Sequence, residues 1–401
     1  MENKYFKSLM FLAILCIGIS VAIQRIHLGT QNVFLGLGIL LMIFAYRQKQ
    51  FVLPDLSWRE ICLPFAVYAV CIMPSVIFSP YKVESIKYFF NAVLLRPLIF
   101  FVVLFLADYI GLIKKMFWGV AAVFSIEGMW SFYQWIIHPA GYRANGFGGY
   151  ELPYACCCCM FYIVFLIVVI DENFSKKERK FGLVGLGCCL LAIIAGESRG
   201  AWLTVALQTL VIGAPYYLNS FKKIAMILIL FIFAGSMFCV PHIRERFLSI
   251  TNVTNNVSNV SRIRTWQSVY IMFKDNPMTG IGMGTWKKIY PAKYYKQQNF
   301  TEQLAHAHNV YLHQLAEGGI FALLGYLVLM GSFFKKHFKN WIERVNPFSS
   351  MCFGVLTTFG LYGIIENVFN LSTSVRTFWF LMGLLSLLFE CYKKERKQKE
   401  I

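Results

Sequence analysis

Charged side chains are scarce in this sequence, and acidic ones are scarcer than basic ones. Only 14% of the 401 residues are charged, 58% are hydrophobic, and 20 Asp and Glu stand against 38 Lys and Arg. An average soluble domain is nearer one-quarter charged and one-half apolar. The composition therefore excludes an ordinary soluble enzyme. Apolar runs of about 20 residues, long enough to cross a membrane, recur from end to end.

Signatures of metal and nucleotide sites are also lacking. The twelve cysteines show no paired CxxC spacing, and most lie inside apolar runs, as Cys156–Cys159 and Cys188–Cys189 do. We interpret them as small apolar packing residues. The GIGMG run at residues 280–284 follows no strand of a Rossmann unit, so it is no dinucleotide-binding loop. We therefore expect neither a metal nor a cofactor.

The apolar runs predict an all-α integral membrane protein of about twelve spans, folded as one polytopic domain over residues 1–401. No cleavable signal sequence precedes the first run, Leu9–Ile23, which we expect to be a retained span. Spans seven and eight leave only Glu197–Gly200 between them, which requires a tight turn. The expected spans lie near residues 8–24, 31–46, 61–78, 88–107, 116–137, 153–171, 182–197, 200–217, 224–241, 310–334, 349–366 and 375–392.

The distribution of positive charge sets the expected orientation. Lys and Arg concentrate in one set of loops and at both ends of the chain, which we therefore place in the cytoplasm. The net charge of +18 reflects this asymmetry and is not a nucleic-acid signature. The largest polar segment, residues 242–310, then lies on the opposite side, which in a bacterial inner membrane is the periplasm. Loops of this length are uncommon unless they are functional or disordered.

The segment 242–310 has distinct parts. A polar stretch, Thr251–Ser261, is expected to be flexible. Apolar residues with a helical period then predict a helix from Ser261 to about Lys274, which Asn276-Pro277 ends. The three glycines between 280 and 284 let the backbone turn closely.

Two arginines are candidates for binding an anion. Arg199 stands at the start of span eight, and Arg262 stands in the first turn of the helix expected from Ser261. The first turn of a helix already favours negative charge, so a cation there suits an anion held jointly by the helix start and the guanidinium. Two such sites facing one cavity suggest a phosphate or diphosphate. The alternative is a pair of interfacial arginines that contact lipid headgroups.

His308 is the candidate general base, because a histidine titrates near neutrality and can accept a proton from an attacking hydroxyl. Its neighbour Asn309 is a candidate for orienting it or a substrate. The alternative is that His308 caps the following helix or is merely a satisfied polar group. His306 is a weaker candidate, and His313 and Glu317, one helical turn apart, are expected to pair with each other.

Three stretches resemble a known superfamily. Residues 196–203, GESRGAWL, resemble the SRGAWL signature of O-antigen ligases and polymerases. Residues 262–284, from Arg262 and Trp266 to NPMTGIGMG, are similar to the R-x-x-x-W…NP-x-x-G-x-G segment of the same superfamily. Residues 306–319, HAHNVYLHQLAEGG, resemble its HN-x-x-L…E-x-G element. The order of these elements and the late long loop agree over roughly residues 140–390.

The resemblance implies a metal-independent, inverting glycosyltransferase with a GT-C-like fold. In the ligases, an undecaprenyl-diphosphate-linked O-antigen is transferred onto a sugar hydroxyl of lipid A–core. Carried over by motif, Arg199 and Arg262 would hold the diphosphate and His308 would activate the acceptor hydroxyl. Further candidates for lining the site are Arg264, His306, Glu317, Glu366 and Arg376.

Several functions remain open at this stage. The SRGAWL stretch and the late long loop favour an O-antigen ligase. An O-antigen polymerase uses the same donor with another lipid-linked repeat as acceptor, and a protein O-oligosaccharyltransferase uses a Ser or Thr side chain. A transporter or flippase belongs to a different class. Its site would lie at the midplane, where only Arg96 and Glu317 are candidate charges.

Overall fold

The computed structural model consists of helices and the turns between them. It describes residues 4–47, 54, 56–217, 220–221, 224, 227–228, 231–232, 235, 237–252, 254–295 and 303–399, and no β-strand occurs in these ranges. The α-helices are α1 (Lys4–Ile23), α2 (Leu28–Tyr46), α3 (Trp58–Ile77), α4 (Lys82–Phe90), α5 (Leu98–Leu104), α6 (Ile110–Ile137), α7 (Glu151–Ile170), α8 (Lys176–Ala195), α9 (Arg199–Val211), α10 (Ala214–Tyr217), α12 (Pro241–Leu248), α13 (Val257–Asp275), α14 (Trp286–Ile289), α15 (Val310–Ile342), α16 (Pro347–Tyr362) and α17 (Ser372–Lys399).

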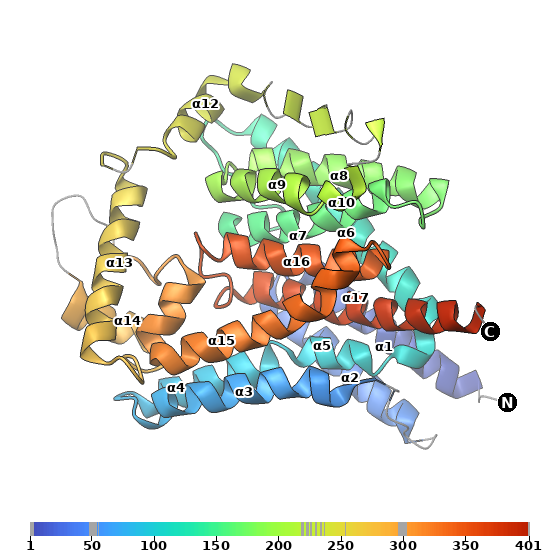
Figure 1. Ribbon diagram of the computed structural model, residues 1–401, viewed down its shortest axis with the longest axis horizontal. Helices are drawn as coiled ribbons and strands as arrows, with labels where there is room; N and C mark the ends of the chain where they lie inside the picture. The colour runs from blue at the N-terminus through green and yellow to red at the C-terminus, as the bar shows by residue number, and fades with distance from the viewer. Residues whose placement is uncertain are drawn as a thin grey trace.

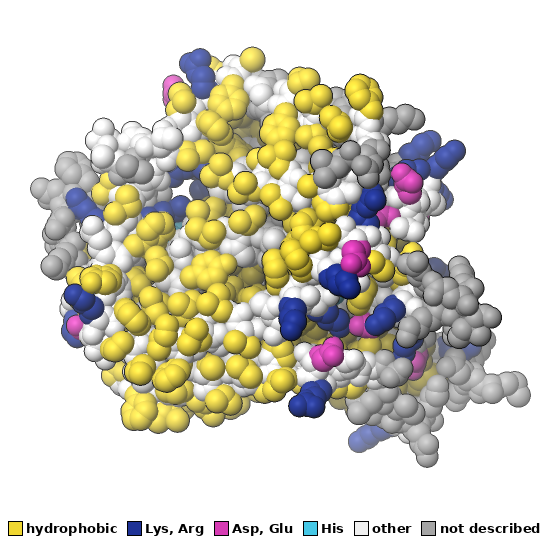
Figure 2. Space-filling view, viewed as in Figure 1, with side chains coloured by type: hydrophobic (Ala, Val, Ile, Leu, Met, Phe, Trp, Pro, Cys, Tyr) yellow, Lys and Arg dark blue, Asp and Glu magenta, His cyan; other side chains and the backbone are white. Residues whose placement is uncertain are grey.

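The long helices run side by side as a bundle, and both chain ends lie at the same end of it (Figure 1). Helices α12, α13 and α14, from the polar segment 242–310, lie at the opposite end, which we call the outer end (Figure 1). The face seen in Figure 2 is broadly apolar, with Lys, Arg, Asp and Glu gathered toward the ends of the bundle. This distribution is typical of a bundle whose flank faces lipid.

Eight helices of the described chain are long and apolar enough to cross a membrane, so the all-α multi-pass membrane fold is confirmed in its broad form. Helices α8, α9 and α16 occupy the seventh, eighth and eleventh expected spans but are not among the eight. The ninth expected span, 224–241, lies partly outside the described residues. The count of twelve spans and the GT-C-like class therefore stay predictions.

Helix α7 is the centre of the bundle. Its four cysteines, Cys156–Cys159, are buried and form no disulfide. Glycines of α8 let that helix approach closely, because an added Cβ at Gly182 or Gly185 would lie 2.7 or 2.5 Å from side chains of α7. Small residues at such contacts favour helix packing in membranes, where apolar burial alone gives little driving force. The interpretation of these cysteines as packing residues is confirmed.

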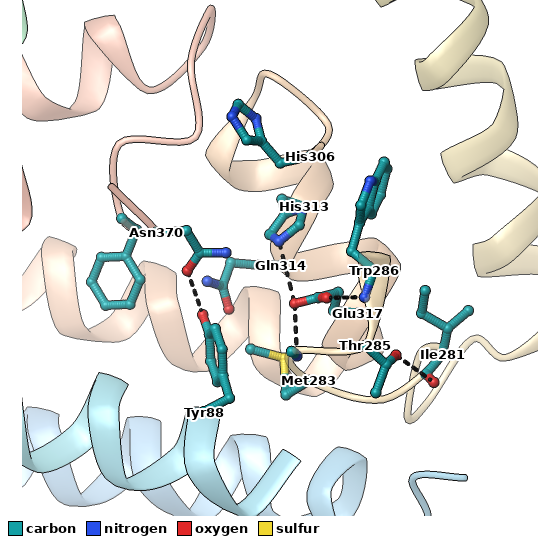
Figure 3. A network of polar contacts seen from close by, with 12 residues as sticks. Tyr88, Ile281, Met283, Thr285, Trp286, His306, His313, Gln314, Glu317 and Asn370 are labelled. Atoms are coloured by element: carbon teal, nitrogen blue, oxygen red, sulfur yellow. Dashed lines mark hydrogen bonds and ion pairs between the residues drawn. The ribbon is translucent and has the colours of Figure 1, made fainter. Parts of the chain in front are cut away.

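The glycine-rich run after α13 docks onto a break in α15. The break is at Gly319, whose φ is +67°. It frees backbone groups that bond to the run: the Ile281 amide donates to the Ala316 carbonyl (2.9 Å) and the Ile320 amide to the Pro277 carbonyl (2.9 Å). The buried carboxylate of Glu317 accepts from the amides of Gly284 (2.9 Å) and Trp286 (2.7 Å) (Figure 3). This docking fixes the glycine-rich run, and with it the end of α13 and the start of α14, against α15 at the outer end of the bundle.

Replacing Gly319 should destabilise the protein through this docking. In Gly319→Ala the new Cβ would lie 2.3 Å from the Met278 carbonyl oxygen, at a φ that L-residues rarely adopt. We expect a loss of at least about 2 kcal/mol of unfolding free energy, seen as a lower thermal midpoint in detergent. The matched control is Gly331→Ala in the same helix, where nothing lies within 4 Å of the added Cβ. Equal midpoints for the two variants would contradict the role assigned to the break.

Candidate functional site

A cavity of about 170 Å³ opens at the outer end of the bundle. It lies between the start of α9, helices α12 and α13, the turn before α15 and the turn after α16. Four of its side chains are cationic and one is a carboxylate. Its polar and charged lining residues are Arg143, Ser198, Arg199, Arg246, Ser258, Arg262, His308, Tyr362 and Glu366.

The turn between α8 and α9 places Arg199 in the cavity. Helix α8 ends at Ala195, Glu197 adopts a φ of +45°, and the Ser198 side chain accepts from the Ala201 amide to cap α9. Gly200 lets the Ile365 side chain pack closely against the start of α9, since an added Cβ would lie 1.7 Å from the end of that side chain. The expected tight turn is therefore confirmed, as is the position of Arg199 at the first residue of a helix.

Arg262 lines the same cavity, but for a different reason from the one the sequence suggested. Helix α13 begins at Val257, capped by the Asn256 side chain, so Arg262 lies in its second turn. The expectation of a helix start at Ser261 was wrong, because the polar stretch before Ser261 supplies the cap and the first turn. The argument from the helix dipole thus fails for Arg262 and holds for Arg199.

Neither Arg199 nor Arg262 is paired with a carboxylate among the described residues. Arg199 donates to the carbonyl and hydroxyl oxygens of Ser249, both at 3.0 Å, and Arg262 forms no hydrogen bond or ion pair in that part of the chain. Burial, then repulsion from Arg262, Arg246 and Arg143, lowers the pKa of Arg199. Two cations that pair with no carboxylate of the described residues thus face one cavity.

Two further arginines of the cavity were missed as site residues by the sequence analysis. Arg143 pairs with Glu151 at 2.6 Å, and Arg246 donates to the Glu197 carbonyl at 2.6 Å and lies 3.7 Å from its carboxylate. Both belong to segments without a recognised motif, so their positive charge was the only sign in the sequence that they could line a site. Because each has an acidic neighbour, the uncompensated positive charge resides on Arg199 and Arg262.

His308 lies at the cavity wall with its imidazole against a buried carboxylate. Its Nδ1 is 2.8 Å from Oε2 of Glu366, whose side chain is 1% exposed. The backbone at His308 has a φ of +47°. Asn309 caps α15, since its side chain accepts from the Leu312 amide (2.9 Å) and donates to the Ile364 carbonyl (2.9 Å). The cap is thus Asn309, which leaves the His308 ring free of that role.

His306 stands beside this pair. Its Nδ1 lies 3.4 Å from Oε1 of Glu366, and its ring centroid is 4.2 Å from that of His308. Burial, which outweighs the attraction of Glu366, lowers the pKa of His306 to about 3, so its ring stays neutral. Ligand atoms of His306, His308 and Glu366 all lie within 4.8 Å of one another, so this group could hold a metal ion. The absence of a metal cofactor stays a prediction.

The remaining candidates do not line the cavity. Glu317 pairs with His313 at 3.2 Å, as expected, and holds the glycine-rich run (Figure 3). Arg264 is not among the residues that line the cavity. Arg376 donates to the side chains of Gln31 and Asn32 on α2. Of the two residues that flank the last outer turn, only Glu366 reaches the cavity.

Part of the chain matches a known protein family. A family model described as O-antigen ligase matches residues 184–327, a range that contains Arg199, Arg262 and His308. The resemblance to the superfamily of O-antigen ligases and polymerases is confirmed over this part of the chain, and it supports a function of that general type. No curated protein matches the chain.

Proposed function

We propose that this chain, whose residues 184–327 match the O-antigen ligase family, is an O-antigen ligase of the bacterial inner membrane. It transfers a glycan from undecaprenyl diphosphate to a sugar hydroxyl of lipid A–core, without a metal and with inversion, at the periplasmic side. The observation that carries the proposal is the cavity in which two uncompensated guanidiniums, Arg199 and Arg262, face the His308–Glu366 pair.

The charge of the cavity fits a diphosphate leaving group. The departing diphosphate gains negative charge as its bond to the anomeric carbon breaks. Preplaced guanidiniums stabilise that charge, and they act more strongly in a site of low dielectric. No carboxylate of the described residues pairs with Arg199 or Arg262, and Arg199 uses only one guanidinium nitrogen for Ser249, so donors of both remain for the two phosphate groups.

The His308–Glu366 pair fits the activation of a hydroxyl. A carboxylate at Nδ1 holds the tautomer in which Nδ1 carries the proton and Nε2 accepts. The acceptor oxygen attacks the anomeric carbon while its proton passes to Nε2 of His308, and the bond from that carbon to the diphosphate oxygen breaks. A single displacement of this kind inverts the anomeric configuration.

An apolar cavity beside the site fits the lipid tail of such a donor. It has a volume of about 390 Å³ and is lined by α8, α9 and α12. Its walls include Leu190, Trp202 and Phe247. Helices α9 and α12 also carry Arg199 and Arg246, so the tail and the diphosphate would lie on neighbouring surfaces.

His308→Ala should abolish most of the transfer while leaving donor binding intact. Loss of a general base costs about 10²- to 10⁴-fold in kcat. The measurement uses purified protein, a synthetic lipid-linked donor and a core acceptor, with donor affinity measured separately. His138→Ala, at an exposed position, is the control. Transfer by His308→Ala at the rate of the control would contradict the assignment of His308 as the general base.

Removing an uncompensated arginine should cost more than removing a paired one. Arg262→Ala loses charge-assisted hydrogen bonds to the diphosphate, and we expect a fall of about 10- to 100-fold in kcat/KM for the donor. Arg143→Ala removes a cation that Glu151 already balances, so its effect should stay below about tenfold. Steady-state kinetics with the same donor compares the two variants. The reverse order would contradict the charge assignment.

Deletion of the gene distinguishes a ligase from a polymerase. Loss of a ligase leaves polymer on undecaprenyl diphosphate and a bare lipopolysaccharide core. Loss of a polymerase leaves single repeats attached to the core. Electrophoresis of lipopolysaccharide and analysis of the lipid-linked pool separate these outcomes, and we expect the first.

A further inference from the structure

Arg96 is a buried cation outside the site already described. It lies between the π-helical turn Asn91–Leu95 and α5 and is 7% exposed. Its guanidinium donates to the Phe369 carbonyl (2.6 Å) and to the Asn370 side-chain oxygen (3.2 Å), and its Nε is buried without a hydrogen-bond partner. No carboxylate pairs with it in the described part of the chain. A charge so placed within a membrane bundle needs compensation.

A second cation lies on the helix that follows the partners of Arg96. Arg376 belongs to α17, which begins two residues after Asn370. It bonds to the amide oxygens of Gln31 and of Asn32 (2.9 Å), and again no carboxylate of the described residues pairs with it. Gln31 is fully buried, and its Nε2 donor has no partner. The two guanidiniums are thus joined to the start of α17, one through Asn370 and one within the helix, and no carboxylate of the described residues pairs with either.

The start of α17 adds to this positive region. The helix has 28 residues and begins at Ser372, four residues before Arg376 and two after Asn370. The first amides of a helix have no acceptors within it, and its dipole favours an anion there. The Tyr88 hydroxyl donates to Asn370 at 2.8 Å, and this bond holds the turn next to Arg96 (Figure 3).

The surroundings indicate a lipid as the source of the anion. Exposed apolar residues flank both arginines: Val33 and Leu37 on α2, beside the partners of Arg376, are 67% and 43% exposed. Leu94 and Leu95, which precede Arg96, are 52% and 56% exposed. Arg376 itself is partly exposed. An anionic group with an apolar body would match this combination of buried cations and apolar rim.

We propose that Arg96, Arg376 and the first turn of α17 form a second anion site, which binds the phosphate group of a membrane lipid at the outer end of the bundle. The site is separate from the cavity, because neither arginine is among the residues that line it. It does not depend on the proposed transfer reaction.

Lipid binding to the purified full-length protein tests this site. The Arg262→Gln background weakens anion binding in the cavity, and thermal midpoints are recorded in detergent against rising phosphatidic acid. Diacylglycerol with the same chains and inorganic phosphate are the comparison ligands. Phosphatidic acid should raise the midpoint, and neither comparison ligand should do so. Arg376→Gln should weaken the apparent affinity about tenfold or more, since it removes a charge-assisted hydrogen bond.

Lys87→Gln is the matched control, because Lys87 is an exposed cation on α4. It should bind phosphatidic acid as the background does. Equal affinities of Arg376→Gln and Lys87→Gln would overturn the site, and a full shift with inorganic phosphate would overturn its assignment to a lipid. Arg96→Gln should resemble Arg376→Gln. If the buried substitution prevents folding, the partly exposed Arg376 alone decides the outcome.

Discussion

The carboxylate of Glu317 accepts hydrogen bonds from the Gly284 and Trp286 amides, and this contact holds the glycine-rich run and α14 against α15. Glu317 is buried in α15, just before the break at Gly319. Burying a carboxylate without hydrogen-bond donors costs free energy, and the two amides and His313 reduce that cost for Glu317. The Trp266 indole also donates to the Ala307 carbonyl at 2.8 Å, which joins α13 to the chain just before His308. Together these contacts set the distance between Arg262, on α13, and His308.

The charge balance of the cavity separates two kinds of arginine. Arg143 and Arg246 each lie next to a carboxylate, whereas no carboxylate of the described residues pairs with Arg199 or Arg262. Mutual repulsion and burial work against holding these cations together without an anion. In the proposed function, a bound diphosphate would recover the stability given up there, because the charge of the cavity is complementary to an anionic ligand.

The sequence predicted many of the parts that local rules govern. Arg199 stands at the start of a helix, His313 pairs with Glu317 one turn away, and most of the apolar runs become long helices. The caps of Ser198 and Asn309 were not predicted, although both follow local rules. The sequence also did not predict contacts between distant segments. Nothing local places Arg246 or Arg143 in the cavity, or turns Arg376 away from it toward α2. The first turn of α13 was misplaced because its polar residues resemble a flexible linker, although Asn256 caps the helix. The sequence made Glu317 a candidate site residue because a charge within a membrane span can have either a functional or a structural role.

In the proposed function, Arg199, Arg262 and His308 act on one substrate in one cavity. A cryo-EM structure of the protein with a non-hydrolysable analogue of an undecaprenyl-diphosphate-linked sugar tests this arrangement. We expect phosphate oxygens within hydrogen-bonding distance of both guanidiniums and an anomeric carbon that faces His308, with space for an acceptor hydroxyl between them. A diphosphate bound away from Arg199 and Arg262, or an anomeric carbon beyond the reach of a hydroxyl bonded to His308, would contradict it.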